Sequence, residues 1–350
     1  MRVAVIGGGL SGLAGALELV EAGAEVVLLE AGDRLGGQIR TTRERGFLVE
    51  EGVDGFAPAQ ETLHRLMHDL RLQERIVVPE ALPTLVLEKP DSLRPAALVE
   101  DLPSAAPIKT LRGGMAELVT AIRRRIERKA DLRIGNAAIA VTRTRPGWTI
   151  YPEIGAALVV DAVLLALPAR PAAWLVHPVS TDGARALSKL VTRPLVTVSA
   201  AYRKATVGHP LNAAGVVLSR DPTANGVGLC AFVSSSFPGR APADWVQLRS
   251  LVRPARGELV VTTDEGWTDI VHAQLAPILG LHEPPGAAWV ARWADATPMV
   301  GSEYPTRVAE ARTALRALGR IELVGAASEG DGLEGALRSG LAGAKQLLGS

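Results

Sequence analysis

The sequence predicts an α/β protein that opens with a strand–helix–strand unit whose two strands are parallel. Residues 2–6 (RVAVI) are a short apolar run typical of a buried parallel strand, and three glycines follow at once. Residues 10–22 then have helical character, and Gly23 stands where a glycine commonly ends a helix. Residues 25–30 (EVVLLE) form the second strand, which completes one βαβ unit.

Composition sets the broad class. The chain has 350 residues, of which 47% are hydrophobic and 21% charged, so it can form about two domains of ~150 residues. The net charge of +1 argues against a nucleic-acid partner, and the basic run 123–125 is expected to face solvent. One cysteine excludes an internal disulfide, and neither a leader nor an apolar run of ~18 residues is evident. We expect a cytoplasmic protein without a transmembrane helix; peripheral membrane contact and a homodimer stay open.

The glycine-rich turn after the first strand has the spacing of a dinucleotide-binding site. Gly7 permits a tight turn, Gly9 lets the backbone approach a pyrophosphate, and Gly12 allows close packing of helix on strand. The start of the helix offers unpaired N–H groups to phosphates. The residues expected to contact the cofactor here are Gly7, Gly8, Gly9, Leu10, Ser11 and Gly12.

The residues after the second strand indicate which dinucleotide is bound. Glu30 ends that strand, where a carboxylate can accept hydrogen bonds from both ribose hydroxyls and would repel the 2′-phosphate of NADP. A second diglycine follows at Gly36 and Gly37, which suits a longer cofactor that needs close backbone approach along its middle. We therefore expect FAD, and the candidate contacts in this segment are Glu30, Ala31, Arg34, Gly36, Gly37 and Gln38.

Residues 30–41 (EAGDRLGGQIRT) resemble the protoporphyrinogen oxidase branch of the flavin amine oxidase superfamily. Residues 49–56 (VEEGVDGF), 111–115 (LRGGM) and 324–340 are similar to further segments of that family. The resemblance implies additional FAD contacts at Gly52, Val53, Asp54, Gly55, Val141, Trp293, Gly325, Asp331, Gly332 and Leu333.

The same resemblance implies the architecture: a discontinuous Rossmann-type FAD-binding domain with a mixed α+β substrate domain. We expect residues 1–57, 108–170 and 299–350 in the FAD-binding domain, and residues 58–107 and 171–298 in the substrate domain. Typical members are longer by roughly a hundred residues, and the piece missing here, around residues 91–107, belongs to the family's cap over the substrate. Within the remnant, Arg94 is the candidate to bind substrate carboxylates.

The function implied by the resemblance is an FAD-dependent oxidase that takes hydride from a reduced tetrapyrrole, protoporphyrinogen or coproporphyrinogen, and reduces O2, as in heme biosynthesis. Two alternatives stay open: an amine or other small-molecule oxidoreductase of the same superfamily, and a flavin-binding protein without catalysis. No side chain is expected to act as a strong base, because the flavin carries the chemistry. The sequence identifies neither the exact substrate nor the physiological electron acceptor.

Other reactive residues receive simpler interpretations. His64 and His68 have a spacing that could hold zinc, but no third ligand follows, so we expect no metal site and ordinary packing. Cys230 is expected in a core rather than as a covalent flavin tether. Residues 264–265 are expected to form a solvated turn within a region, 170–298, of alternating strands and turns.

Overall fold

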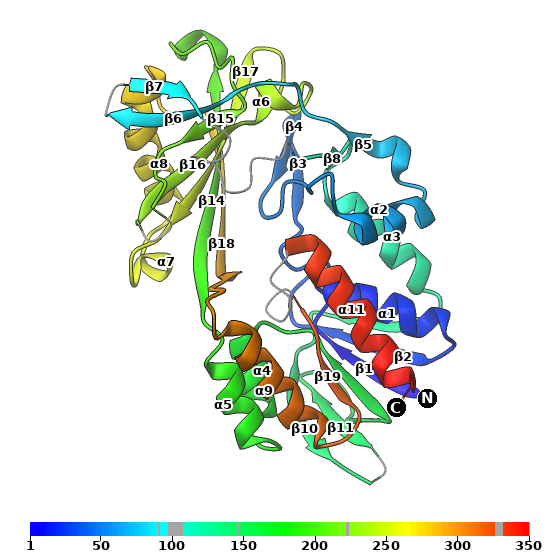
Figure 1. Cartoon of the computed structure of the whole chain (residues 1–350). Helices are drawn as coiled ribbons and strands as arrows, with labels where there is room; N and C mark the ends of the chain where they lie inside the picture. The colour runs from blue at the N-terminus through cyan, green and yellow to red at the C-terminus, as the bar shows by residue number, and fades with distance from the viewer. Residues whose placement is uncertain (90–91, 97–107, 146, 222–223, 326–331, 350) are drawn as a thin grey trace.

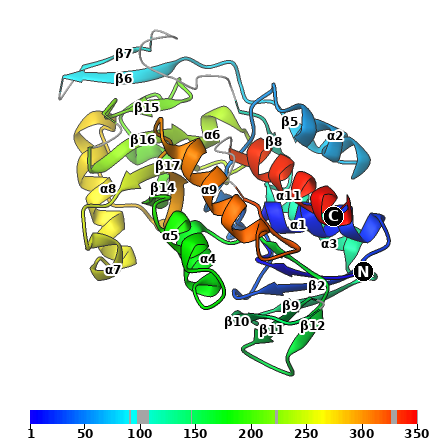
Figure 2. The ribbon, with the colours of Figure 1, turned by 60° about the horizontal axis from the view of Figure 1, so that its bottom comes forward.

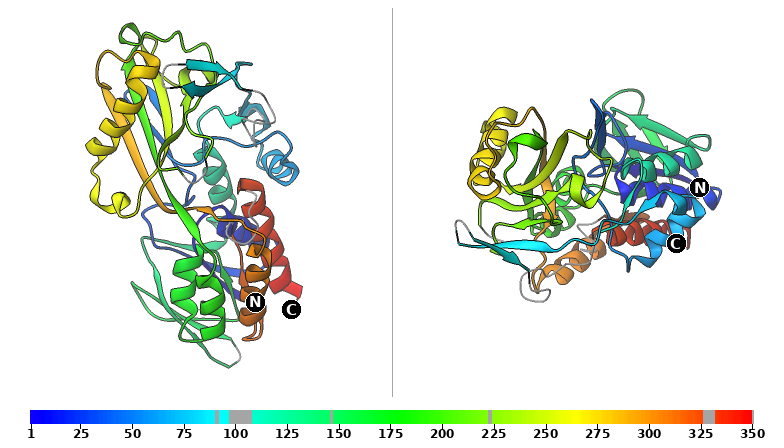
Figure 3. Two further views of the ribbon diagram at one scale, coloured as in Figure 1. Left: turned by 60° about the vertical axis from the view of Figure 1, so that its left-hand side comes forward. Right: turned by 90° about the horizontal axis from the view of Figure 1, so that it is seen from above.

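The computed structural model describes residues 1–89, 92–96, 108–145, 147–221, 224–325 and 332–349. Two large sheets form the molecule, and the long strands β14 and β18 run from one sheet toward the helices beside the other (Figure 1). The N-terminus and the end of the last helix lie close together (Figures 1 and 3). No helix among the described residues is long and apolar enough to cross a membrane.

The first sheet is fully parallel, with the strand order β19-β13-β1-β2-β9. Its strands are β1 (Arg2–Ile6), β2 (Glu25–Glu30), β9 (Ala130–Ile134), β13 (Ala162–Leu165) and β19 (Ile321–Leu323). Alternate side chains enter different cores: Val3 and Val5 point to one face, and Ala4 and Ile6 to the other. Both faces are therefore buried, which explains why the strand sequences are continuously apolar.

Helices cover the first face of this sheet (Figure 2). They are α1 (Leu10–Glu21), α2 (Glu61–Asp69), α3 (Ala116–Ile126) and α11 (Gly332–Gly349). Helices α1 and α11 touch backbone to backbone, because a Cβ at Gly340 would lie 2.1 Å from the carbonyl oxygen of Ser11. This contact brings the end of the chain beside its first helix.

An antiparallel sheet and three further helices cover the opposite face. The elements are β10 (Ala138–Arg143), β11 (Trp148–Pro152), β12 (Leu158–Val160), α4 (Ala169–Val176), α5 (Thr181–Ser188) and α9 (Tyr304–Arg316). Helices α2, α4 and α5 thus pack with the first sheet. The sequence analysis expects α2, α5 and most of α4 in the substrate domain instead. The division into domains stays a prediction.

The second sheet has seven strands in the order β18-β14-β17-β16-β15-β6-β7. Their bounds are β6 (Thr84–Lys89), β7 (Ser92–Pro95), β14 (Thr192–Arg203), β15 (Gly215–Val217), β16 (Gly226–Phe232), β17 (Trp245–Arg253) and β18 (Ala287–Pro298). Helix α8 (Asp264–Leu279) buries Trp267 and Leu275 against one face of this sheet. Shorter elements complete the fold: β3 (Thr41–Glu44), β4 (Phe47–Glu50), η1 (Gln73–Arg75), β5 (Ile76–Val77), β8 (Thr110–Leu111), η2 (Lys204–Thr206), α6 (Val233–Ser236) and α7 (Glu258–Val261).

The expected βαβ unit is confirmed. Residues 264–265 are exposed, as expected, but the turn expected there is wrong. They begin α8 after a cap in which Thr263 Oγ1 accepts from Gly266 N. Asp264 also forms an ion pair with Arg292 of β18. The helix escaped prediction because Pro277 and Gly266 interrupt its pattern.

Candidate functional site

In the turn after β1, Gly7 and Gly12 are packed tightly against neighbouring backbone, whereas Gly9 has free space beside it. Gly7 has φ of +107°, a conformation that L side chains rarely adopt, and a Cβ at Gly12 would lie 1.9 Å from the Gly7 carbonyl oxygen. Gly9 differs, since its φ is −68° and a Cβ there would meet nothing nearer than 4.0 Å. Gly7 and Gly12 are therefore required for packing, whereas Gly9 borders open space.

The first turn of α1 presents its backbone N–H groups beside this space. Gly9 is the N-cap, no side chain caps the helix among the described residues, and the first turn carries no acidic residue. Leu10 and Ser11, the first two residues of the helix, are buried. A helix N-terminus with free N–H groups is electrically positive and accommodates a pyrophosphate. The residues present fit a dinucleotide.

Glu30 points back toward the same turn from the end of β2. Its Oε2 accepts from Gly8 N at 2.6 Å, and its Oε1 accepts from Gly32 N at 2.8 Å. A carboxylate has about four acceptor positions, so this arrangement leaves room for hydroxyl donors. The carboxylate is thus oriented by the glycine turn, and the neighbouring Ala31 is exposed.

The second diglycine lies directly against the first glycine turn. Gly36 N donates to the Gly8 carbonyl oxygen at 2.8 Å, and a Cβ at Gly37 would come within 3.1 Å of Gly9 Cα. The guanidinium of Arg34 donates to the carbonyl oxygens of Gly37 (2.8 Å) and Ile39 (2.9 Å). Arg34 therefore holds the loop in shape. The two glycine-rich loops are thus in direct contact, although they lie on either side of α1 and β2 in the sequence.

The side chain of Gln38, directly after the second diglycine, connects this loop with the second sheet. Gln38 Nε2 donates to the carbonyl oxygens of Asp295 (3.2 Å) and Ala296 (3.1 Å) on β18. The backbone carbonyl oxygen of Gln38 accepts from Val53 N at 2.9 Å, and a Cβ at Gly52 would lie 1.9 Å from that oxygen. A side chain at position 52 would therefore prevent this close approach. Gly55 permits a second one, because a Cβ at that position would lie 2.4 Å from the Lys109 carbonyl oxygen.

Trp293, which the resemblance marks as a flavin neighbour, lies against the same loop. Its Nε1 donates to the Glu51 carbonyl oxygen at 2.9 Å, and its ring is 3.0 Å from the position of a Cβ at Gly52. Thr197 Oγ1 of β14 donates to the same carbonyl oxygen. The face of the second sheet opposite α8 is thus in contact with residues 51–52.

Two arginines that sequence reasoning missed, Arg240 and Arg249, hold the loop of residues 50–54. Arg249 of β17 donates to the carbonyl oxygens of Glu50 and Gly52 and forms a 2.8 Å ion pair with Asp54. Arg240, after α6, forms a 3.1 Å ion pair with the carboxylate of Glu50, and both side chains are buried. A charged residue inside the buried strand 245–253 was the available signal for Arg249.

The remaining residues predicted as cofactor or substrate contacts lie on several other elements. Gly325 has φ of +135° and donates to Ser339 Oγ at 3.1 Å, while Gly332 and Leu333 begin α11. Asp331 lies outside the described residues. Val141 is buried in β10. Arg94 lies in β7 at the edge of the second sheet, where its Nε forms a 2.7 Å ion pair with Glu88; its role in substrate binding stays a prediction.

The family profile described as flavin containing amine oxidoreductase matches residues 10–107 and 87–348 of this chain. The chain belongs to this family. The coproporphyrinogen III oxidase of Bacillus subtilis (strain 168) is 20% identical, and the match covers 99% of the chain and 98% of the relative. The coproporphyrinogen III oxidase of Propionibacterium freudenreichii subsp. freudenreichii is 22% identical over 85% of the chain and 81% of the relative.

Solved structures of flavin amine oxidoreductases share the fold. A protein of Exiguobacterium sp. 255-15, provisionally assigned as a protoporphyrinogen oxidase, superimposes with a TM-score of 0.88 at 20% identity and covers 100% of this chain and 99% of its own. Cyclohexylamine oxidase from Brevibacterium oxydans IH-35A gives a TM-score of 0.78 at 15% identity, with 99% and 98% covered. This flavin amine oxidoreductase is shorter than its relatives, since the Bacillus alignment spans 463 positions and the chain has 350 residues.

Family membership and the fit of the glycine turn together identify an FAD-dependent oxidoreductase. When bound, FAD supplies a two-electron acceptor, and the protein contributes binding, orientation and shielding from water. Among the described residues, no group of three or more histidine, cysteine or acidic side chains could hold a metal ion. His64 instead contacts the Gln60 carbonyl oxygen through Nδ1 at 2.7 Å.

Proposed function

We propose that the protein oxidises a reduced tetrapyrrole, protoporphyrinogen or coproporphyrinogen, and that O2 is the electron acceptor. Each turnover would remove a hydride from a methylene bridge of the macrocycle and a proton from a pyrrole nitrogen, which is two electrons and two protons in total. O2 would take up the same two electrons and two protons to give hydrogen peroxide. Electrons and atoms then balance without a further reactant.

One observation carries this proposal: two relatives whose matches cover 85% and 99% of the chain are coproporphyrinogen III oxidases. The match to an amine oxidase, that of Rattus norvegicus, covers 20% of the chain. The solved amine oxidases support the shared fold alone. Identity of 20–22% leaves the choice of tetrapyrrole open, so the proposal names the class of substrate.

We propose a position for the cofactor, which the geometry of the turn supports. The pyrophosphate would lie at Gly9 and the N-terminus of α1, and the ribose would lie at Glu30. The flavin end would extend past Gly36 and Gly37 toward residues 52–55 and Trp293, which Arg249 and Gln38 hold in place. These chain segments would orient the flavin and exclude water, and no described side chain needs to act as the base.

The short length of the chain favours a second candidate, oxidation of an amine or another small molecule, because a smaller cover over the site would suit a smaller substrate. Anaerobic mixing of the FAD-loaded protein with protoporphyrinogen, coproporphyrinogen and a panel of amines, followed at the flavin absorbance, tests both. Bleaching by a porphyrinogen, with hydrogen peroxide formed after air is admitted, supports the first. Bleaching by amines alone supports the second, and a flavin that stays oxidised with every compound contradicts both.

A further inference from the structure

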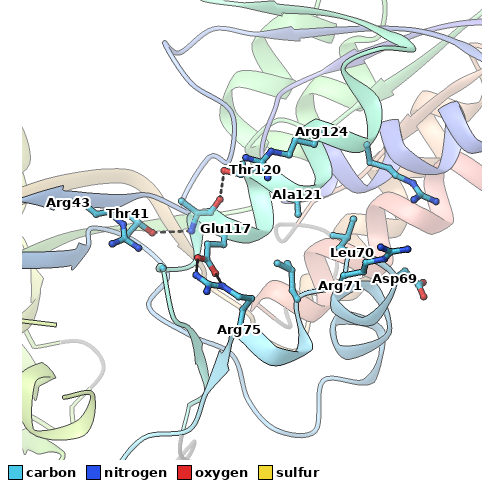
Figure 4. A pocket seen from close by; sticks show the side chains of 14 residues that line it. Thr41, Arg43, Asp69, Leu70, Arg71, Arg75, Glu117, Thr120, Ala121 and Arg124 are labelled. Carbon is cyan, nitrogen blue, oxygen red and sulfur yellow. Dashed lines mark hydrogen bonds and ion pairs between the residues drawn. The ribbon is translucent and has the colours of Figure 1, made fainter. Parts of the chain in front are cut away.

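A basic pocket lies apart from the cofactor site, between the end of α2, strand β3 and the exposed side of α3 (Figure 4). Its volume is about 770 Å³, which is within the range of small-molecule sites, roughly 300–1,000 Å³. Five arginines line it: Arg43, Arg71, Arg75, Arg124 and Arg125. None of the lining residues is among the expected FAD contacts, so the pocket is a separate feature.

The positive charge of this pocket is only partly balanced. Arg75 is held by Glu117, and Arg125 forms a 3.1 Å ion pair with Glu21. Arg43, Arg71 and Arg124 have no ion-pair partner among the residues that the structure describes. In Figure 4, the side chains of β3, α2 and α3 surround one open space. Asp69 and Glu117 also line the hollow, so its five arginines outnumber its two carboxylates and leave it with a net positive charge.

Arg71 lies at the end of α2 with a left-handed backbone. Arg71 follows the C-cap of α2 with φ of +58°, where glycine closes a helix with the least strain. The chain instead carries an arginine whose side chain enters the pocket. The conformation ends α2, because Leu72 N donates to the Met67 carbonyl oxygen, and an arginine is more strained there than a glycine would be.

We propose that this pocket binds a small polyanion with at least two phosphate or carboxylate groups. Guanidinium groups present paired N–H donors that match both kinds of oxyanion. Three separated arginines require more than one anionic group to engage them together. Leu70 and Ala121 add apolar wall that can accommodate a carbon skeleton.

Isothermal titration calorimetry on the FAD-loaded protein tests the proposal, with inorganic pyrophosphate and citrate as separate probes at low salt. FAD must be present, because the turn at Gly9 could otherwise bind pyrophosphate itself. We expect one saturable site per chain that weakens as salt is added. Pyrophosphate binding alone would assign a phosphate ligand, citrate binding alone a polycarboxylate ligand, and binding of both a site that accepts either anion.

Single substitutions distinguish a specific anion site from nonspecific electrostatic attraction to the protein. Arg71→Gly should weaken binding at least about tenfold while the melting temperature stays equal or rises, because it removes the cation and relieves the backbone. Arg124→Ala should weaken binding similarly. Arg128→Ala removes the same charge outside the pocket and should change affinity less than about twofold. No saturable heat with either probe, or equal losses in Arg128→Ala and Arg71→Gly, would overturn the proposal.

Discussion

Arg249 and Asp54 form a 2.8 Å ion pair that joins β17 of the second sheet to the loop after β4. The arginine side chain is buried, and its guanidinium also donates to the carbonyl oxygens of Glu50 and Gly52. One planar group thus satisfies three acceptors of a loop that carries several expected FAD contacts. A flexible loop at this position would leave the flavin poorly oriented.

Arg249→Lys should therefore destabilise the protein by about 3 kcal/mol and lower its FAD content, since an ammonium lacks the fork that reaches three acceptors. Thermal unfolding followed by circular dichroism and the ratio of flavin to protein absorbance measure the two effects. Arg185→Ala is the control, because its ion pair with Asp182 is exposed and worth about 0–1 kcal/mol. Equal stability of Arg249→Lys and the parent would contradict this role.

The glycine turn permits a paired test of fold against cofactor. Gly9→Val should fold, because φ is −68° and the Cβ position is open, but it should abolish FAD binding by occupying the pyrophosphate space. Gly12→Ala should damage the fold, since its Cβ would lie 1.9 Å from the Gly7 carbonyl oxygen. Melting curves and flavin content distinguish the two. A Gly9→Val protein that retains FAD would show that this turn serves the fold alone.

Glu30→Ala should weaken FAD binding at least about tenfold. The carboxylate is expected to accept charge-assisted hydrogen bonds from the ribose, each worth roughly 1.5–3 kcal/mol, and ~1.4 kcal/mol is one decade. The substitution also removes acceptors for Gly8 N and Gly32 N, so the turn itself loosens. Fluorescence titration of flavin-free protein with FAD gives the dissociation constant. An unchanged constant would mean that the ribose lies elsewhere.

Cys230 should be inert in the folded protein and should not tether the flavin. It is fully buried in the core under α8, and this burial raises the pKa of its thiol from 9.0 to about 12. The folded chain therefore keeps the proton that the unfolded chain loses, so this contribution to stability is present below pH ~9 and is lost as pH rises toward 12.

Two measurements check this prediction. Iodoacetamide at pH 8.5 should label Cys230 only after unfolding, and acid precipitation should release FAD to the supernatant. Rapid labelling of the folded protein, or flavin that stays with the pellet, would contradict it.

The sequence by itself determined the elements whose signals are local. The apolar strands 2–6 and 25–30, the spacing of Gly7, Gly9 and Gly12, and the acid at Glu30 lie within thirty residues. Each feature follows from backbone geometry and from burial between covering layers, which neighbouring residues are enough to specify. FAD as the cofactor was predicted from these residues, and membership of the flavin amine oxidase superfamily from the resemblance of residues 30–41 and of later segments; both are confirmed.

Only the tertiary structure decided what holds these elements together. Arg249 meets Asp54 across 195 residues of chain, and Arg240 meets Glu50 across 190, so no local pattern could indicate either pair. The basic pocket likewise gathers arginines from β3, from the turn after α2, from η1 and from α3. The run on α3, taken alone, suggested a solvated surface. Charged side chains are placed by partners that folding brings near. Their roles therefore depend on contacts between distant segments, whereas the strands and turns depend on neighbours in the chain.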